Sequence, residues 1–201
     1  MVGWAGGPTP ERGSRGRPSA RRLWWHARGM SSTDRDPNVP CRVAVLSDTH
    51  LRPGGRGLPA SVLERLAAAD VILHAGDVVT GHLLDELTRV APTHAVLGNN
   101  DHDLVGVLPE TLELTLGGVR VAMIHDSGAR AGRPNRMRRR FPDADVVVFG
   151  HSHDPVDEAG ADGQWLFNPG SPTQRRRQPD ATMGELELAG GQIVAHRIFV
   201  V

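Results

Sequence analysis

The chain has 201 residues, with 23 basic and 23 acidic side chains, so its formal net charge is zero. This balance disfavours a dedicated nucleic-acid-binding protein, which is expected to be clearly basic. The single cysteine, Cys41, excludes a disulfide framework and a cysteine-rich zinc module. No stretch approaches the roughly 18 apolar residues that a membrane span needs. We therefore expect a soluble cytoplasmic protein that does not act at a membrane.

Residues 1–40 are predicted to form a disordered basic tail, and residues 41–201 to form the folded domain. The first 29 residues hold six arginines against one acid, Glu11, and show neither helical nor strand periodicity. An arginine pair at 21–22 has no apolar segment after it, so we expect no export signal. Met30 is the expected true start of the chain.

From Arg42 onward, one pattern occurs five times: a short apolar run is followed by small residues and then by side chains that can bind metal. The runs span residues 43–46, 71–73, 95–97, 119–124 and 146–149. Each run is typical of a buried strand. Between the first three runs, residues 59–68 and 83–90 have apolar side chains three and four apart. This spacing predicts crossover helices beside a parallel sheet.

The second half of the chain predicts further strands. Gly117 and Gly118 separate residues 112–116 from residues 119–124 and predict a hairpin, because paired glycines supply the positive φ of a two-residue turn. Residues 133–140 predict a short basic helix. The alternating segments after His153 predict a second, antiparallel sheet. The expected fold is α/β, with two sheets and helices outside them.

Seven side chains at the ends of the predicted strands are of types that bind metal ions. Two pairs are spaced two residues apart, so in extended backbone each pair leaves its strand on one side. Because sites gather at the carboxyl ends of parallel strands, we expect all seven to converge on one sheet edge. The seven are Asp48, His50, Asp77, Asn99, His125, His151 and His153. We expect the histidines at 74, 82, 94 and 196 to fill surface or core-edge positions.

The donor types of this set indicate which metals it would hold. Carboxylate, imidazole and amide groups without a thiolate favour Mn²⁺, Fe²⁺ or Zn²⁺, with Ni²⁺ also compatible. Seven donors exceed the need of one ion, and two ions can be held if one carboxylate bridges them. Asp77 is the natural bridge, since the other donors divide evenly about it. Two such ions indicate a hydrolytic centre.

Together these residues resemble the calcineurin-like metallophosphoesterases, and most closely the small prokaryotic phosphodiesterase branch, whose fold is shared by the metallophosphoesterase-like subunit of retromer. The family signature consists of Asp-x-His, Gly-Asp, Gly-Asn-x-Asp, a single His and Gly-His-x-His. Here it stands at residues 48–50, 76–77, 98–101, 125 and 150–153. The resemblance covers about residues 42–200. It implies a four-layer α/β/β/α sandwich with two mixed β-sheets flanked by helices.

The resemblance also implies how the seven donors divide between two divalent ions, for which Mn²⁺ is the first expectation. Asp77 would bridge the ions, and a hydroxide between them would be the nucleophile. The other donors would be Asp48, His50 and His153 for the first ion, and Asn99, His125 and His151 for the second.

Two further residues are candidate catalytic residues by the same resemblance. Asp101 would act from behind the metal ligands, for example by fixing the tautomer of a ligand histidine. Asn100 stands where many larger family members have a histidine, and its amide can donate a hydrogen bond but cannot deliver a proton. We therefore expect a preference for diesters with good leaving groups.

The expected function is dinuclear-metal-dependent hydrolysis of a small phosphodiester or nucleotide-like substrate. One alternative is a catalytically silent, protein-binding scaffold on the same fold, and another is a phosphomonoesterase. A scaffold is expected to lose metal ligands, whereas every matched position here keeps a competent side chain. The arginines at 136, 138–140 and 175–177 either frame the cleft or, as charge runs usually do, form a solvated face.

Overall fold

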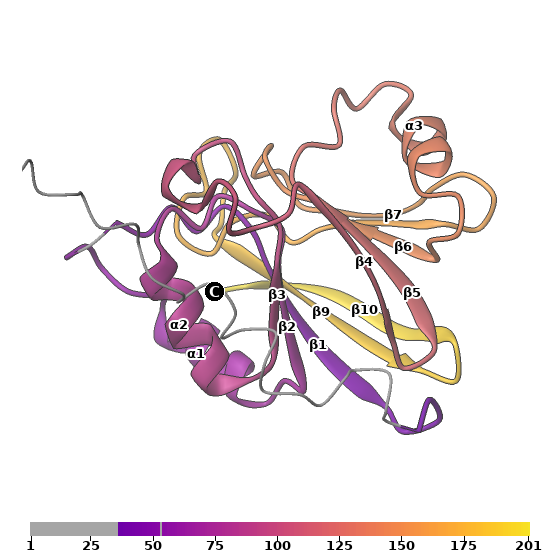
Figure 1. Cartoon of the computed structure of the whole chain (residues 1–201), viewed down its shortest axis with the longest axis horizontal. Helices are drawn as coiled ribbons and strands as arrows, with labels where there is room; N and C mark the ends of the chain where they lie inside the picture. The colour runs from indigo at the N-terminus through magenta and orange to yellow at the C-terminus, as the bar shows by residue number, and fades with distance from the viewer. Residues whose placement is uncertain (1–35, 53) are drawn as a thin grey trace, which may run out of the picture.

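A computed structural model describes residues 36–52 and 54–201, which contain ten β-strands, three α-helices and one short 3₁₀ helix (Figure 1). Residues 1–35 of the expected tail, with the alternative start at Met30, lie outside the described residues, whereas residues 36–40 are described and form a turn before the first strand. Within the described ranges, no helix combines the length and the apolar character that crossing a membrane requires.

The first sheet has five strands in the order β10-β9-β1-β2-β3. These are β1 (Cys41–Leu46), β2 (Val71–His74), β3 (Thr93–Ala95), β9 (Thr182–Ala189) and β10 (Gln192–Val200). β1, β2 and β3 are parallel, as predicted, and are connected by α1 (Ala60–Ala67) and α2 (Gly81–Val90). β9 and β10 extend the sheet with antiparallel pairing, which makes the sheet mixed.

The second sheet has the order β4-β5-β6-β8-β7. Its strands are β4 (Thr111–Leu116), β5 (Val119–Ile124), β6 (Val146–Val148), β7 (Val156–Ala159) and β8 (Trp165–Asn168). β5, β6 and β8 are parallel, and the two outer strands are antiparallel to their neighbours. The predicted hairpin joins β4 to β5, with φ of 54° at Gly117 and 80° at Gly118. The basic helix α3 (Arg133–Arg140) and the 3₁₀ helix η1 (His102–Leu104) complete the fold.

The prediction of a separate antiparallel sheet after His153 is wrong. β7 and β8 join the second sheet, whereas β9 and β10 return to the first and pair beside β1. The physical reason is burial: Leu186 and Leu188 of β9 lie in the same apolar layer as Val43 and Val45 of β1. Pairing with β1 therefore places the apolar face of β9 in the existing core.

The alternation of side chains explains the four layers. In β1, Val43 and Val45 belong to the apolar layer between the sheets, whereas Ala44 and Leu46 pack with α1 and α2. Met137 of α3 belongs to a third cluster on the outer face of the second sheet. In Figure 1, α1 and α2 lie beside the first sheet and α3 lies beside the second. The predicted α/β/β/α sandwich with two mixed sheets is confirmed.

Close packing between the sheets makes Gly184 intolerant of a side chain. A Cβ atom at Gly184 would lie 2.3 Å from Cε1 of Phe167. We predict that Gly184→Ala lowers the free energy of unfolding by about 1–3 kcal/mol through overpacking. The control is Gly57→Ala, where a Cβ atom would meet nothing within 4 Å. Urea unfolding measures both variants, and equal midpoints for the two would contradict the prediction.

Candidate metal centre

The side chains predicted to bind metal lie in the loops that follow five strands, and the structure brings them together. Three of these strands, β1, β2 and β3, belong to the first sheet, while β5 and β6 belong to the second. The expectation of a single sheet edge is therefore wrong. The donors meet at one end of the sandwich, where loops from both sheets converge, because the two sheets pack face to face over a shared apolar layer.

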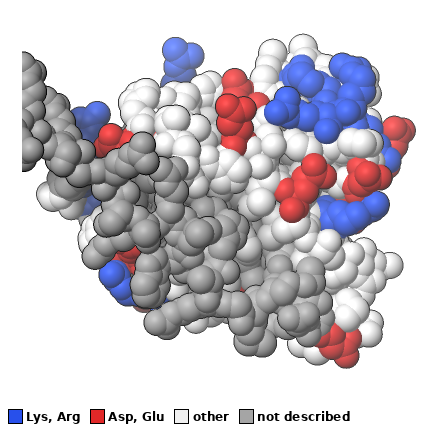
Figure 2. All heavy atoms as spheres, in the orientation of Figure 1, with Lys and Arg blue, Asp and Glu red and all other residues white. Residues whose placement is uncertain are grey.

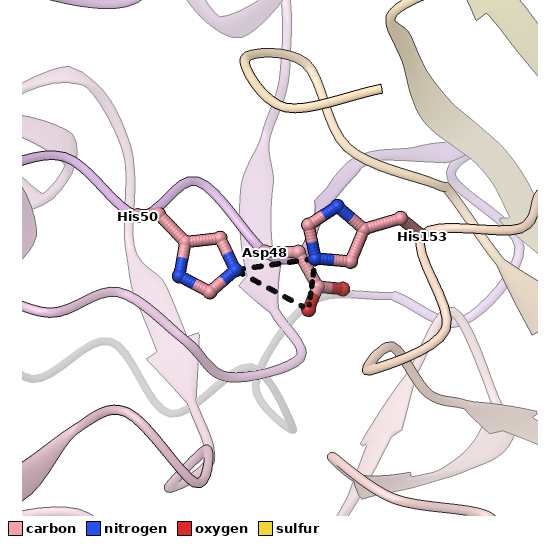
Figure 3. Close-up of side chains that lie close together, drawn as sticks. All are labelled: Asp48, His50 and His153. Carbon is pink, nitrogen blue, oxygen red and sulfur yellow. Dashed lines mark hydrogen bonds and ion pairs between the residues drawn. The ribbon is translucent and has the colours of Figure 1, made fainter. Parts of the chain in front are cut away.

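One group of donors consists of Asp48, His50 and His153, whose side chains point toward one another in Figure 3. Nε2 of His153 lies 3.3 Å from Oδ1 of Asp48 and 3.2 Å from Nε2 of His50. Nε2 of His50 lies 3.9 Å from the same carboxylate oxygen. Asp48 and His153 are buried, and His50 is partly exposed. One atom from each side chain thus faces a common point.

A second group consists of Asn99, His125 and His151. Oδ1 of Asn99 lies 3.1 Å from Nε2 of His125 and 2.9 Å from Nδ1 of His151. His125 is buried, whereas Asn99 and His151 are exposed. This side of the centre therefore faces solvent.

Asp77 lies between the two groups. Its Oδ2 atom is 3.5 Å from Nε2 of His50 and 3.5 Å from Nε2 of His125. Its other oxygen, Oδ1, accepts a hydrogen bond of 2.8 Å from the backbone N–H of Asn100. One oxygen of Asp77 is thereby oriented toward both groups of donors.

The carboxylate of Asp48 fits a metal ligand. Its Oδ2 atom accepts hydrogen bonds from the Ser47 hydroxyl at 2.6 Å and from the backbone N–H of His151 at 2.9 Å. Its Oδ1 atom is fully buried and has no hydrogen-bond partner among the described residues. A buried carboxylate oxygen that accepts no hydrogen bond is costly unless a cation binds it. The unpaired atom is the one that faces His50 and His153.

Backbone carbonyls fix the tautomers of two of the histidines. Nδ1 of His125 lies 2.7 Å from the carbonyl oxygen of Ala75, and Nδ1 of His153 hydrogen-bonds the carbonyl oxygen of Gln174. Because a carbonyl oxygen can only accept, both Nδ1 atoms carry the proton. The lone pair of Nε2 is then available in each ring, as in metal-binding histidines. The donor set fits divalent ions that accept imidazole and carboxylate ligands.

Five of the seven donor residues have a left-handed backbone, with φ between 46° and 70°. They are Asp48, His50, Asp77, His151 and His153. The expectation of extended backbone at the two pairs is therefore wrong. This conformation costs roughly 1–3 kcal/mol per non-glycine residue and persists only where the surroundings determine it. Here the backbone N–H groups of Asp48 and His50 donate to the carbonyl oxygens of Gly76 and Asp77, at 2.9 and 3.0 Å.

Two positions of the predicted motifs require glycine, because neighbouring loops approach their backbone closely. A Cβ atom at Gly150 would lie 1.8 Å from Oγ of Ser47 and 2.7 Å from Oδ2 of Asp48. A Cβ atom at Gly98 would lie 2.1 Å from the backbone nitrogen of Asp77. The loops after different strands therefore pack backbone against side chain, which brings the donors within reach of one another.

The acids of the centre are held in their charged form. Burial acts to raise the pKa of Asp77, but its interaction with His125 and the hydrogen bonds from Asn100 outweigh burial and keep this pKa far below its usual range. The pKa of Asp48 is also lowered, because its interactions with His153 and Ser47 outweigh burial. The pKa of His125 is raised, since burial is outweighed by its interactions with Asp77 and Asp48. Two buried negative charges favour cations at this site.

Asp101 and Asn100, the two predicted catalytic residues, contact Asp77 and its loop. Both oxygens of Asp101 accept backbone N–H groups: Oδ2 from Asp77 at 3.0 Å and from Gly98 at 2.7 Å, and Oδ1 from Val79 at 2.6 Å. The expected hydrogen bond from Asp101 to a ligand histidine is not found in the described part of the chain. The Asn100 amide donates to Oδ2 of Asp77 at 2.6 Å. Both residues therefore position Asp77.

Sequence reasoning missed the residues that support the donors from behind. Ser47 and Ser171 both hold Asp48: the Ser47 hydroxyl donates to its carboxylate, and the Ser171 hydroxyl donates to its carbonyl oxygen at 2.8 Å.

His74, expected at the surface or core edge, is fully buried, with Nε2 3.0 Å from Oγ1 of Thr49. The position of His74 directly before a metal motif was the only signal in the sequence.

Two of the arginines after His125 form contacts away from the metal donors. Arg136 donates to the carbonyl oxygens of Ser127 at 2.8 Å and of Ala129 at 2.5 Å, and so holds the loop that leads into α3. Arg138 pairs with Asp162 at 3.7 Å. These contacts favour the interpretation of a solvated face over one that frames the cleft.

Comparison with known proteins agrees with this geometry. The model of the calcineurin-like phosphoesterase superfamily domain matches residues 41–191. The chain belongs to this superfamily. A probable metallophosphoesterase of Methanothermobacter thermautotrophicus is 32% identical over 143 residues, which are 70% of this chain and 83% of that protein. The family implies phosphoester hydrolysis with divalent metal ions, and the resemblance found in the sequence is confirmed.

Two solved structures share the superfamily fold at lower identity. Vacuolar protein sorting 29 of Cryptosporidium parvum aligns with a TM-score of 0.65 and 20% identity, over 81% of this chain and 99% of that one. A structure described as a novel archaeal phosphodiesterase aligns with a TM-score of 0.62 and 19% identity, over 80% of this chain and 99% of that one. One name refers to sorting and the other to catalysis, so the fold alone does not decide the activity of this metallophosphoesterase.

We predict that Asp101→Asn weakens the centre without removing a metal donor. The amide replaces one acceptor oxygen with an N–H₂ group that faces backbone donors, so the free energy of unfolding should fall by roughly 2 kcal/mol. Asp103→Asn, at an exposed neighbouring position, is the control and should change stability little. Chemical denaturation measures both variants. Equal stability of the two would show that Asp101 does not hold the loops.

His74 predicts a dependence of stability on pH. Burial lowers its pKa from 6.5 to about 4, so between these values the unfolded chain binds the proton more readily than the folded chain. Stability should therefore fall as the pH drops from 6.5 to 4, with about 2–3 kcal/mol due to His74. His74→Gln should reduce this loss, as measured by urea unfolding in EDTA at several pH values. An identical pH dependence in both proteins would contradict the prediction.

Proposed function

We propose that the chain is a phosphodiesterase that uses two divalent metal ions. The observation that carries this proposal is the position of Oδ2 of Asp77, 3.5 Å from Nε2 of His50 and 3.5 Å from Nε2 of His125. A carboxylate oxygen that faces two separate groups of donors is the arrangement that a bridging ligand requires. The family implies divalent metal ions, and this geometry favours two of them.

Each proposed ion would take three donors in addition to Asp77. These are Asp48 Oδ1, His50 Nε2 and His153 Nε2 for the first ion, and Asn99 Oδ1, His125 Nε2 and His151 Nδ1 for the second. Mn²⁺ is our first candidate, and Ni²⁺, Fe²⁺ and Zn²⁺ accept the same nitrogen and oxygen donors.

When bound, such ions supply a hydroxide nucleophile at neutral pH and neutralise charge on the phosphoryl oxygens. The contribution of the chain is orientation. The carbonyl oxygens of Ala75 and Gln174 hold His125 and His153 with Nε2 toward the centre, so these rings need not reorganise during the reaction. Asn99 and His151 are exposed, and this side gives a small phosphodiester or nucleotide-like substrate access to the donors.

The groups beside the centre favour diesters with good leaving groups. The residue after Asn99 is Asn100, whose amide donates to Asp77 and has no proton to release. The side chain of His102 is exposed at the start of η1 and takes part in no hydrogen bond found in residues 36–52 and 54–201. A leaving group that departs without protonation does not need such a donor.

We predict that metal-stripped protein regains activity when a transition metal is added. Mn²⁺, Ni²⁺, Zn²⁺ and Mg²⁺ are supplied separately, with bis-p-nitrophenyl phosphate as the diester and p-nitrophenyl phosphate as the monoester. Release of nitrophenolate from the diester should be restored and should exceed release from the monoester. Asp77→Asn should reduce the rate by at least about 100-fold, because it weakens the proposed bridge.

The other outcomes separate the alternative functions. Faster turnover of the monoester would indicate a phosphomonoesterase. Stoichiometric metal binding without turnover of either ester would favour a protein-binding scaffold. Full activity in Asp77→Asn would exclude the proposed arrangement of the ions.

A further inference from the structure

A β-turn with two arginines at its tip follows the Asn168–Ser171 turn. The backbone N–H of Gln178 donates to the carbonyl oxygen of Arg175 at 2.8 Å, which leaves Arg176 and Arg177 as the two central residues. Arg176 has a φ of 51°, in the left-handed region that some β-turns require at their first central position. Both central arginines are exposed. The turn therefore holds two guanidinium groups in solvent.

The residues before this turn are tied to the metal centre. The carbonyl oxygen of Gln174 accepts the Nδ1 proton of His153. The hydroxyl of Thr173 donates to the carbonyl oxygen of Thr49 at 2.6 Å, between two of the proposed metal ligands. The start of the turn is thus held against loops from both sheets, so its position relative to the centre is defined.

The other side of the turn is also anchored. The side-chain amide of Gln178 donates to Oδ1 of Asp154 at 3.1 Å. The guanidinium of Arg175 donates to the carbonyl oxygen of Pro179 at 2.6 Å and is engaged within its own loop. The guanidinium groups of Arg176 and Arg177 differ, because they form no hydrogen bond or ion pair with any residue that the structure describes. Of the two, Arg176 is nearer along the chain to Gln174, and it is available to a ligand.

The short segment between these anchors and the turn keeps Arg176 beside the first group of donors. Arg176 follows Gln174 by two residues, so its Cα atom lies within about 7 Å of the Cα atom of the residue whose carbonyl oxygen accepts from His153. Arg176 is not itself one of the metal donors.

We propose that Arg176 binds a second phosphate group of the substrate, beyond the phosphate that is cleaved. The inference rests on the proposed function, in which the two ions bind the scissile phosphate and leave this cation for a further anion. A guanidinium group matches phosphate with two parallel N–H donors, and such charge-assisted pairs are strong. The preferred substrates are therefore phosphodiesters that carry an additional terminal phosphate.

A matched pair of probes tests this preference. One is thymidine 3′-(p-nitrophenyl phosphate), and the other is the same compound with a 5′-phosphate. The manganese-loaded enzyme should cleave the 5′-phosphorylated probe with a kcat/KM about tenfold higher. Arg176→Gln should abolish this ratio while keeping the rate on the unphosphorylated probe. Arg176→Lys should retain part of it, since lysine keeps the charge but not the paired donors.

The control is Arg139→Gln, which removes the same charge from the basic cluster that α3 presents in Figure 2. Arg139 is exposed, so this variant should keep the wild-type ratio. Thermal unfolding of both variants should match that of wild type, because both side chains lie on the surface. An equal loss of the ratio in Arg139→Gln would assign the preference to net charge and overturn the role of Arg176.

Equilibrium binding separates this inference from the proposed function. Calorimetry compares thymidine 3′,5′-bisphosphate with thymidine 3′-phosphate, and Arg176→Gln should weaken only the bisphosphate. Arg176-dependent binding without turnover of any diester would leave the phosphate site standing and overturn the proposed activity. Hydrolysis of both probes at equal kcat/KM, unaffected by Arg176→Gln, would leave the activity standing and overturn the phosphate site.

Discussion

The centre depends on holding one carboxylate, that of Asp77, where two groups of donors meet. Its backbone N–H donates to Asp101, its carbonyl oxygen accepts from the backbone of His50, and its Oδ1 atom accepts from the backbone of Asn100. These contacts leave Oδ2 directed between His50 and His125. Because burial opposes its charge, the carboxylate depends on His125 and Asn100 to stay ionised. Most other features of the site serve this placement.

The sandwich explains why donors so far apart in sequence meet. Asp48 follows β1, the middle strand of the first sheet, and His153 follows β6, the middle strand of the second. Sheets that pack face to face lie about 10 Å apart, a distance that two side chains can bridge at the open end. Gly150 and Gly98 let the loops approach without the clash that a Cβ atom would cause. Packing of the core therefore determines the spacing of the donors.

The sequence was enough to predict which side chains gather at one end of the sandwich, because the local pattern identifies the strand ends. Asp48 and His125 each follow a buried apolar run. It was not enough to predict that β9 pairs with β1, since periodicity shows which face of a strand is apolar but not which neighbour it chooses. The left-handed backbone of Asp48 depends on a hydrogen bond to Gly76, a tertiary contact with no local signature. Gln174 contributes a carbonyl oxygen, which any residue type carries.

The origin of the donors in both sheets has a mechanical consequence. Asp48 and Asp77 belong to loops of the first sheet, while His125 and His153 belong to loops of the second. A cation bound by donors from both sheets would link the two sheets at this end of the molecule. Separating the loops there would then require release of the cation. By mass action, a ligand at 100 times its dissociation constant stabilises the closed form by about 2.7 kcal/mol. The supply of metal in the surroundings would then govern how often this end of the molecule opens to proteases, as well as whether it can react.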